Sequence, residues 1–120
     1  MRIFDSHTHL NSEEFINDVP KYLAQARALE VVRMAIVGSN TQLNADAIKL
    51  AETYPELVAI VGWHPEDSKD YTPATEKVLI EQLQHPKVVA LGEIGLDYHW
   101  DTSPQSVQRE VFARQVAIAK

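Results

Sequence analysis

The chain has 120 residues, and 45% of them are hydrophobic, which fits one globular domain and argues against a disordered chain. The net charge is −6 with no basic cluster, so the sequence lacks the positive face of proteins that hold nucleic acid through phosphate contacts alone. Cysteine is absent, which excludes disulfides, zinc–thiolate sites and cysteine nucleophiles. No apolar run reaches the length of a membrane span and no signal-peptide pattern is present, so we expect a cytoplasmic protein.

Four short apolar runs, rich in β-branched residues, each precede a segment with helical character. They cover residues 3–5, 31–37, 57–61 and 88–91. Their near-continuous hydrophobicity is typical of parallel strands that are buried on both faces. We therefore predict four parallel strands at these positions.

Helix start signals follow each of these runs, at Asp18-Val19-Pro20, Asn40-Thr41, Thr72-Pro73 and Ser103-Pro104. Apolar residues then recur at helical spacing through Leu29, Tyr54, Leu83 and Ile118, respectively. We interpret these stripes as the core-facing sides of four helices.

Strands that alternate with helices in units of roughly 30 residues predict a parallel sheet with right-handed crossovers. No glycine-rich loop follows the first strand, so neither a dinucleotide fingerprint nor a P-loop is present. A flavodoxin-like sheet would need a fifth strand. The remaining interpretation is that residues 1–120 form the first half, four βα units, of a TIM (β/α)8 barrel of about 250 residues.

The last helical pattern is still running at Lys120 without a capping signal, so we expect the chain to be part of a longer protein whose C-terminal half is absent. Alone, four βα units would expose two sheet edges and the apolar interior of half a barrel. We expect such a chain to associate with a second copy or with its missing half.

Polar residues follow the first strand in the segment Asp5-Ser6-His7-Thr8-His9. Residues two apart share a face of a strand, so His7 and His9 would present two imidazoles together, with Asp5 one step earlier on the same face. Neutral imidazole nitrogens are common metal ligands. The alternative is a pair of surface histidines without a ligand.

The other strands also end in polar residues, and active sites of parallel sheets form at these carboxyl ends. Glu93 follows the fourth strand, where a carboxylate could bridge two cations or act as a base. His64 follows the third strand as a contact to substrate or to the metal ligands, or as a structural histidine. Asp97 and Tyr98 come later and would shape the loop or touch substrate.

Three further residues are weaker candidates. His99 and Trp100 could stack on a base or sugar, although loop packing is the favoured interpretation. His85 precedes Pro86 on the opposite side of the predicted sheet, so we expect no role for it in the site.

Four segments resemble the TatD-related metal-dependent deoxyribonucleases in order and spacing. They are Asp5-Ser6-His7-Thr8-His9-Leu10, Gly62-Trp63-His64-Pro65, Gly92-Glu93-Ile94-Gly95-Leu96-Asp97-Tyr98 and Gln108-Arg109-Glu110-Val111-Phe112 with Gln115. The resemblance implies a TIM-barrel hydrolase of the metallo-dependent superfamily that cleaves DNA phosphodiester bonds, with single-stranded DNA or DNA ends as its substrate.

By that resemblance, His7 and His9 would ligate one metal ion, and Glu93 would bridge two and serve in catalysis. The divalent ions would be Mg, Mn or Zn, two per complete site. The family's remaining ligands, two histidines and an aspartate, follow later strands, so we expect the 120 residues alone to be inactive.

Two other functions remain open. A metal-dependent hydrolase of an amide, lactone or other ester would fit the same barrel, and the negative net charge favours it. A non-catalytic half barrel that acts as an association module would fit the exposed edges.

Overall fold

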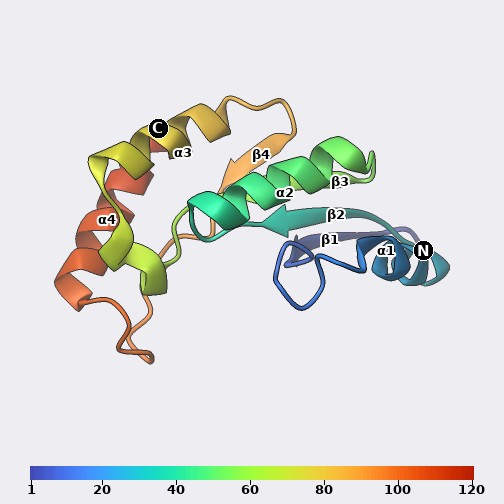
Figure 1. Ribbon diagram of the computed structural model, residues 1–120, viewed down its shortest axis with the longest axis horizontal. Helices are drawn as coiled ribbons and strands as arrows, with labels where there is room; N and C mark the ends of the chain where they lie inside the picture. The colour runs from blue at the N-terminus through green and yellow to red at the C-terminus, as the bar shows by residue number, and fades with distance from the viewer.

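The structure, a computed structural model, describes residues 1–120 and contains one four-stranded parallel sheet, with helices between the strands (Figure 1). The strands are β1 (Ile3–Thr8), β2 (Val31–Val37), β3 (Leu57–Val61) and β4 (Val88–Leu91). The helices are α1 (Val19–Ala28), α2 (Thr41–Thr53), α3 (Pro73–Leu83) and α4 (Gln105–Ile118), with a 3-10 helix η1 (Pro65–Asp70). None of these helices is long and apolar enough to cross a membrane.

The strands lie in the order β1-β2-β3-β4, so each is paired with its neighbour in sequence and the sheet has two free edges. The predicted bounds of β2, β3 and β4 are confirmed. The predicted end of the first strand at Asp5 is wrong, because pairing with β2 continues to Thr8, opposite Ile36. His7 therefore lies inside β1.

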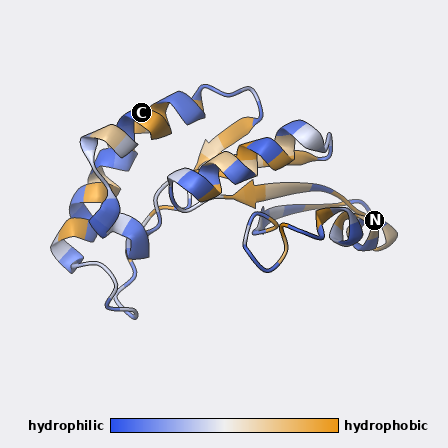
Figure 2. Ribbon diagram, in the orientation of Figure 1, coloured by the Kyte–Doolittle hydropathy of each residue, from blue (hydrophilic) through white to orange (hydrophobic).

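Helices cover one face of the sheet only. On β3, Leu57, Ala59 and Val61 are fully buried, whereas Val58 and Ile60, which alternate with them, are partly exposed. In Figure 2, β4 and the carboxyl-terminal part of β2 are orange, and the helices carry both orange and blue segments. The prediction that the strands are buried on both faces is therefore wrong for β1, β3 and β4, whereas residues 34–37 of the central strand β2 are buried on both faces.

That uncovered face carries large apolar side chains. Phe4 of β1 and Val89 of β4 are 55% and 59% exposed, and they line a shallow hollow with Arg33 and Val58. In a closed barrel this face would be the packed interior.

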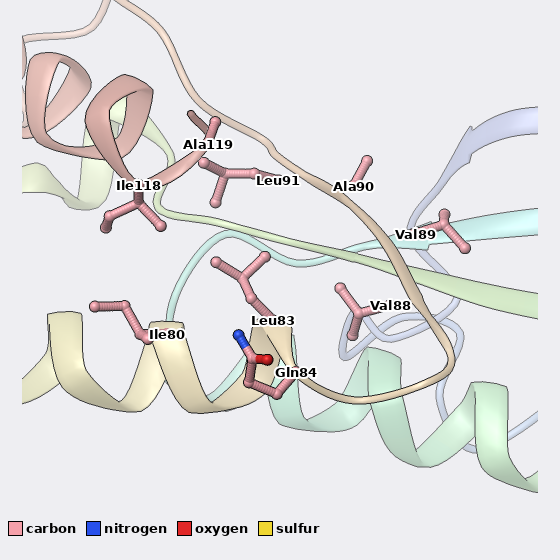
Figure 3. A pocket seen from close by; sticks show the side chains of 9 residues that line it. All are labelled: Ile80, Leu83, Gln84, Val88, Val89, Ala90, Leu91, Ile118 and Ala119. Carbon is pink, nitrogen blue, oxygen red and sulfur yellow. The ribbon is translucent and has the colours of Figure 1, made fainter.

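A second apolar surface lies beside the free edge of β4. Figure 3 shows a groove between α3, β4 and the end of α4, with a volume of about 490 Å³. Eight of its nine residues are hydrophobic, among them Leu83, Val88, Leu91 and Ile118. The groove and the uncovered face together are the exposed apolar surfaces that the sequence predicts for half a barrel.

Two of the four helix starts are capped as predicted. The Asn40 side chain accepts a hydrogen bond from the Leu43 amide, and Thr72 forms a capping box with Thr75. Asp18 does precede α1, but its side chain makes no capping hydrogen bond. Leu29, predicted for the core, follows the end of α1 and is 73% exposed.

The start of α4 also differs from the prediction. Ser103 does not cap the helix, since Pro104 occupies the cap position and the Ser103 hydroxyl bonds the backbone of η1 instead. These bonds attach the loop before α4 to η1, and Figure 1 shows both at the end of the molecule away from the N-terminus.

One ionic cluster joins α4 to α3. The Arg114 guanidinium donates two hydrogen bonds of 2.7 Å to the carboxylate of Glu76, and the Tyr71 hydroxyl donates a third, also 2.7 Å. The hydrogen bonds from Arg114 and Tyr71 lower the pKa of Glu76, whereas burial and the neighbouring Glu76 raise the pKa of Tyr71. This cluster fixes α4 against α3.

Candidate metal centre

The end of β1 places two imidazole rings side by side. The Nε2 atoms of His7 and His9 lie 3.1 Å apart, and the ring centroids are separated by 4.9 Å. Asp5 is not part of the group of converging ligand atoms, and its carboxylate accepts a hydrogen bond from the His7 backbone amide at 3.2 Å. Asp5 thereby helps to shape the strand end from which both histidines project.

A backbone carbonyl of β2 sets the protonation pattern of His9. Its Nδ1 lies 3.1 Å from the carbonyl oxygen of Val37. A carbonyl only accepts hydrogen bonds, so Nδ1 carries the proton and the lone pair is at Nε2. This is the arrangement found in metal-binding histidines, whose second nitrogen donates to a carbonyl or carboxylate.

Glu93 completes the group from the end of β4. Its Oε2 lies 3.3 Å from Nε2 of His7 and 4.0 Å from Nε2 of His9. Two backbone hydrogen bonds fix this segment, since the Gly92 amide donates to Val61 at the end of β3 and the Glu93 amide donates to Gly38, which follows β2. The ligand atoms of His7, His9 and Glu93 all lie within 4.8 Å of one another, although 84 residues separate His9 from Glu93 in the sequence.

These residues fit a divalent cation in their chemistry. The Nε2 lone pair of His9 and the carboxylate of Glu93 are both acceptors, and they converge at a place where a positive charge would satisfy them. The side chains are about half exposed for the two histidines and 35% exposed for Glu93, so a hydrated ion could reach them. Two imidazoles and a carboxylate are common ligands of Zn and other divalent ions.

His64 lies on the other side of Glu93. Its Nε2 is 3.7 Å from Oε1 of Glu93, and its Nδ1 accepts a hydrogen bond from the Glu66 amide at 3.2 Å. The structure thus places His64 beside the group, with its side chain 21% exposed. The sequence alone did not distinguish this position from that of a purely structural histidine.

The other candidates lie in the loop after Glu93. The Asp97 carboxylate accepts a hydrogen bond from the His99 amide, and the Tyr98 hydroxyl accepts one from Arg109. His99 and Trp100 pack edge to face, with ring centroids 4.6 Å apart. These contacts shape the loop, and a contact of Asp97 or Tyr98 with substrate stays a prediction.

Buried side-chain amides hold the strand ends in place, a role that the sequence pattern alone does not reveal. Asn44 of α2 accepts from the Gly62 amide and donates to the Gly62 carbonyl. Gln108 of α4 pairs in the same way with both backbone polar atoms of Asp97, and Asn11 donates to the carbonyl of Val37. A signal was available for α4, because a glutamine that recurs on an apolar helical stripe must find buried partners.

The family model for "TatD related DNase" matches residues 4–120 of this chain. The chain is 42% identical over 118 residues to the uncharacterized metal-dependent hydrolase YabD of Bacillus subtilis strain 168, covering 98% of this chain and 46% of that protein. It is 37% identical over 117 residues to the 3'-5' ssDNA/RNA exonuclease TatD of Salmonella typhimurium, covering 98% and 45%. The chain thus spans about half the length of these relatives.

Solved structures agree with the sequence comparison. The crystal structure of YJJV, a TatD homologue from Escherichia coli K12, superposes with a TM-score of 0.92 at 30% identity, covering 99% of this chain and 47% of that one. A TatD-family hydrolase from Entamoeba histolytica has the same fold, with a TM-score of 0.89 at 20% identity over 98% of this chain and 46% of that one. The predicted fold class, four βα units of a TIM barrel, is confirmed, and the chain belongs to the TatD-related DNase family.

Proposed function

We propose that this chain supplies the first part of the metal centre of a deoxyribonuclease that cleaves DNA phosphodiester bonds, with single-stranded DNA or DNA ends as its substrate. The observation that carries the proposal is the convergence of His7, His9 and Glu93 at the carboxyl ends of β1 and β4. The names of its relatives support the reaction class, because they include a metal-dependent hydrolase and a single-strand DNA and RNA exonuclease.

In this proposal His7 and His9 would hold one divalent ion, and Glu93 would help to hold both ions of a complete site. When bound, such ions supply an activated water and compensate the charge of a phosphate group. Mg, Mn and Zn all fit a site of two imidazoles and a carboxylate, and phosphate chemistry favours the harder ions. The net charge of −6 makes this compensation necessary for an anionic substrate.

The residues of this chain contribute positioning. The Val37 carbonyl keeps the His9 lone pair directed at the site, and the bonds from Gly92 and Glu93 to β3 and β2 hold the carboxylate opposite both rings. These three residues would supply only part of the ligands of a first ion and would offer a second ion only Glu93. We therefore propose that residues 1–120 alone are inactive and that the longer protein, with the C-terminal half of the barrel, is the enzyme.

The experiment is a hydrolysis assay on the longer protein that contains this chain. We expect release of nucleotides from single-stranded DNA with added Mg²⁺ or Mn²⁺, and a loss of at least about 100-fold for His7→Ala and for Glu93→Gln. His85→Ala is the matched control, because His85 pairs with Glu52 and lies outside the metal group. Unchanged hydrolysis in the Glu93 variant would refute the role of Glu93.

A metal-dependent hydrolase of an amide, lactone or other ester is the second candidate, and the acidic character of the chain favours it. A panel of these substrates beside single-stranded DNA separates the two reactions. Turnover of a lactone or amide, with no DNA cleavage by the same preparation, would decide for this candidate.

A third candidate is a non-catalytic association module. Self-association of the 120 residues is favoured by three features: the free edges of β1 and β4, the exposed Phe4 and Val89, and the apolar groove at α3 and α4. Sedimentation of this chain should then show dimers or larger species. A monomer that binds no hydrophobic dye would contradict self-association.

A further inference from the structure

We propose that His64 is a positioning residue of the metal centre, which donates a hydrogen bond from Nε2 to Oε1 of Glu93 and does not ligate a metal ion. This inference rests on the proposed function, since it assigns a task within the same site. Three features of the molecule support it: the hydrogen bonds of the His64 ring, the contacts that fix the segment after His64, and the same local arrangement at His85.

The amide of Glu66 determines which nitrogen of His64 carries the proton. This amide donates to Nδ1 at 3.2 Å, and an amide can only donate, so Nδ1 holds the lone pair and Nε2 carries the hydrogen. His9 has the opposite pattern, because its Nδ1 meets the Val37 carbonyl. One histidine is thus prepared to accept a cation at Nε2, and the other presents an N–H there.

The local sequence produces this arrangement. Pro65 has no amide hydrogen and favours an extended conformation for the residue before it, and His64 has φ −63° and ψ 145°. The first available amide is then that of Glu66, two residues on. His85-Pro86-Lys87 repeats the pattern, because the Lys87 amide donates to Nδ1 of His85 at 3.1 Å.

His85 shows which kind of partner the Nε2 atom meets in this arrangement. Nε2 of His85 lies 2.9 Å from Oε1 of Glu52, a hydrogen bond to a carboxylate. Nε2 of His64 likewise faces a glutamate oxygen, Oε1 of Glu93, at 3.7 Å. Hydrogen bonds of active sites are often long without ligand and shorten in the complex.

The segment that carries the Glu66 amide is fixed from two sides. The Ser103 hydroxyl donates to the Glu66 carbonyl at 2.6 Å and accepts from the Lys69 amide at 3.0 Å. The His64 amide donates to the Ser39 carbonyl at the end of β2, at 2.9 Å. These bonds hold the Glu66 amide next to Nδ1 of His64, and the Glu66 carboxylate lies farther from the same nitrogen, at 3.8 Å.

The two oxygens of Glu93 consequently have different neighbours. Oε2 faces the imidazoles of His7 and His9, and Oε1 faces the N–H of His64. A donor on Oε1 restricts rotation of the carboxylate and keeps Oε2 directed at the histidines. Partners of this kind affect metal affinity by about 10- to 100-fold in other proteins.

Two substitutions separate the proposed contact of His64 with Glu93 from the hydrogen bond that His64 accepts from the Glu66 amide at the start of η1. His64→Asn keeps a side-chain acceptor for the Glu66 amide but is too short to reach Glu93, whereas His64→Gln places an amide N–H near the position of Nε2. His85→Asn is the matched control, because it likewise keeps an acceptor for the amide two residues on and loses a contact with a carboxylate, but outside the site. All are made in the longer protein and titrated calorimetrically with Mn²⁺ in the absence of DNA.

We expect His64→Asn to bind Mn²⁺ about 10- to 100-fold more weakly with an unchanged unfolding midpoint, and His64→Gln to recover most of the affinity. His85→Asn should bind as the wild type does. Wild-type affinity in His64→Asn, with a raised KM for DNA, would overturn the proposal and make the substrate phosphate the acceptor of His64.

A spectroscopic measurement tests the same inference without metal. Nitrogen-15 NMR of the metal-free protein should show His64 protonated at Nε2 and His9 protonated at Nδ1. A proton on Nδ1 of His64 would overturn the assignment while leaving the proposed nuclease function untouched. Absence of any Mn²⁺ binding by the wild type would instead overturn the proposed function, and this inference with it.

Discussion

The side-chain amide of Gln115 pairs with both backbone polar atoms of Trp63. The Trp63 amide donates to Oε1 at 2.8 Å, and Nε2 donates to the Trp63 carbonyl at 3.0 Å, across 52 residues of sequence. Both partners are buried. This pair fixes α4 to the end of β3, directly before His64.

We expect Gln115→Leu to lower the free energy of unfolding by about 2–4 kcal/mol, because it leaves a buried amide and a buried carbonyl without partners. Chemical denaturation followed by circular dichroism measures the change. Gln105→Leu is the control, since Gln105 is exposed on the same helix and the same substitution there should change stability by less than about 0.5 kcal/mol. Equal effects of the two variants would contradict the importance of the pair.

Gly62 permits the close approach of β3 to the segment that carries Glu93. A Cβ atom at this position would lie 2.6 Å from the carbonyl carbon and oxygen of Gly92, which are backbone atoms and cannot rotate away. We expect Gly62→Ala to destabilise the protein by about 1–3 kcal/mol and to weaken Mn²⁺ binding, since Glu93 follows Gly92 directly. Thermal unfolding and metal titration of one preparation measure both effects, and wild-type values for both would refute the argument.

Bound metal should stabilise the native state. At a free Mn²⁺ concentration of 100 times the dissociation constant, we expect a gain of about 2.7 kcal/mol, because the ion binds the folded site and not the unfolded chain. His9→Ala should lose most of this gain, and His85→Ala should retain it, as measured by unfolding with and without Mn²⁺. A metal-dependent shift that survives in the His9 variant would place the ion elsewhere.

The Glu76 cluster predicts a pH dependence of stability. Hydrogen bonds from Arg114 and then Tyr71 lower the pKa of Glu76 below its ordinary value of 4.5. A lowered pKa in the folded state contributes stability above pH 4.5, and this contribution is lost as the pH falls through the lowered value. Denaturation between pH 7 and pH 3 should therefore show a smaller acid dependence for Glu76→Gln than for the wild type.

Glu81→Gln provides the comparison for this measurement, because Glu81 is exposed on the same helix α3. Its acid dependence should equal that of the wild type. The same profile in all three proteins would show that the Glu76 cluster does not contribute to the pH dependence.

The bounds of β2, β3 and β4 could be predicted because each strand is a short apolar run that ends at a glycine or a proline-containing turn. β1 was predicted too short, because Ser6 and His7 are polar and only pairing with β2 shows that the strand continues. That pairing joins residues far apart in the sequence, so the residues of β1 alone do not indicate it. Sequence patterns thus locate strands that are apolar throughout, but they understate a strand whose end carries the site.

The group of His7, His9 and Glu93 could be predicted because the carboxyl ends of parallel strands meet at one edge of a sheet. The protonation patterns of His9 and His64 could not be predicted from the sequence. Each depends on one backbone group that the fold places beside the ring, a carbonyl for His9 and an amide for His64. The pairing of Gln115 with Trp63 was equally inaccessible, because a polar residue on a helix gives no indication of which distant amide it will meet.

The side chains that hold the strand ends, Asn11, Asn44, Gln108 and Gln115, are all neutral amides with backbone partners. Neutral hydrogen bonds are little affected by ionic strength, whereas attraction between a charged site and a polyanion is strongly screened. In the proposed nuclease, added salt should therefore alter the encounter with DNA while leaving these four amide pairs unchanged. The salt dependence of the reaction would then report on the encounter with the nucleic acid and not on the integrity of the scaffold.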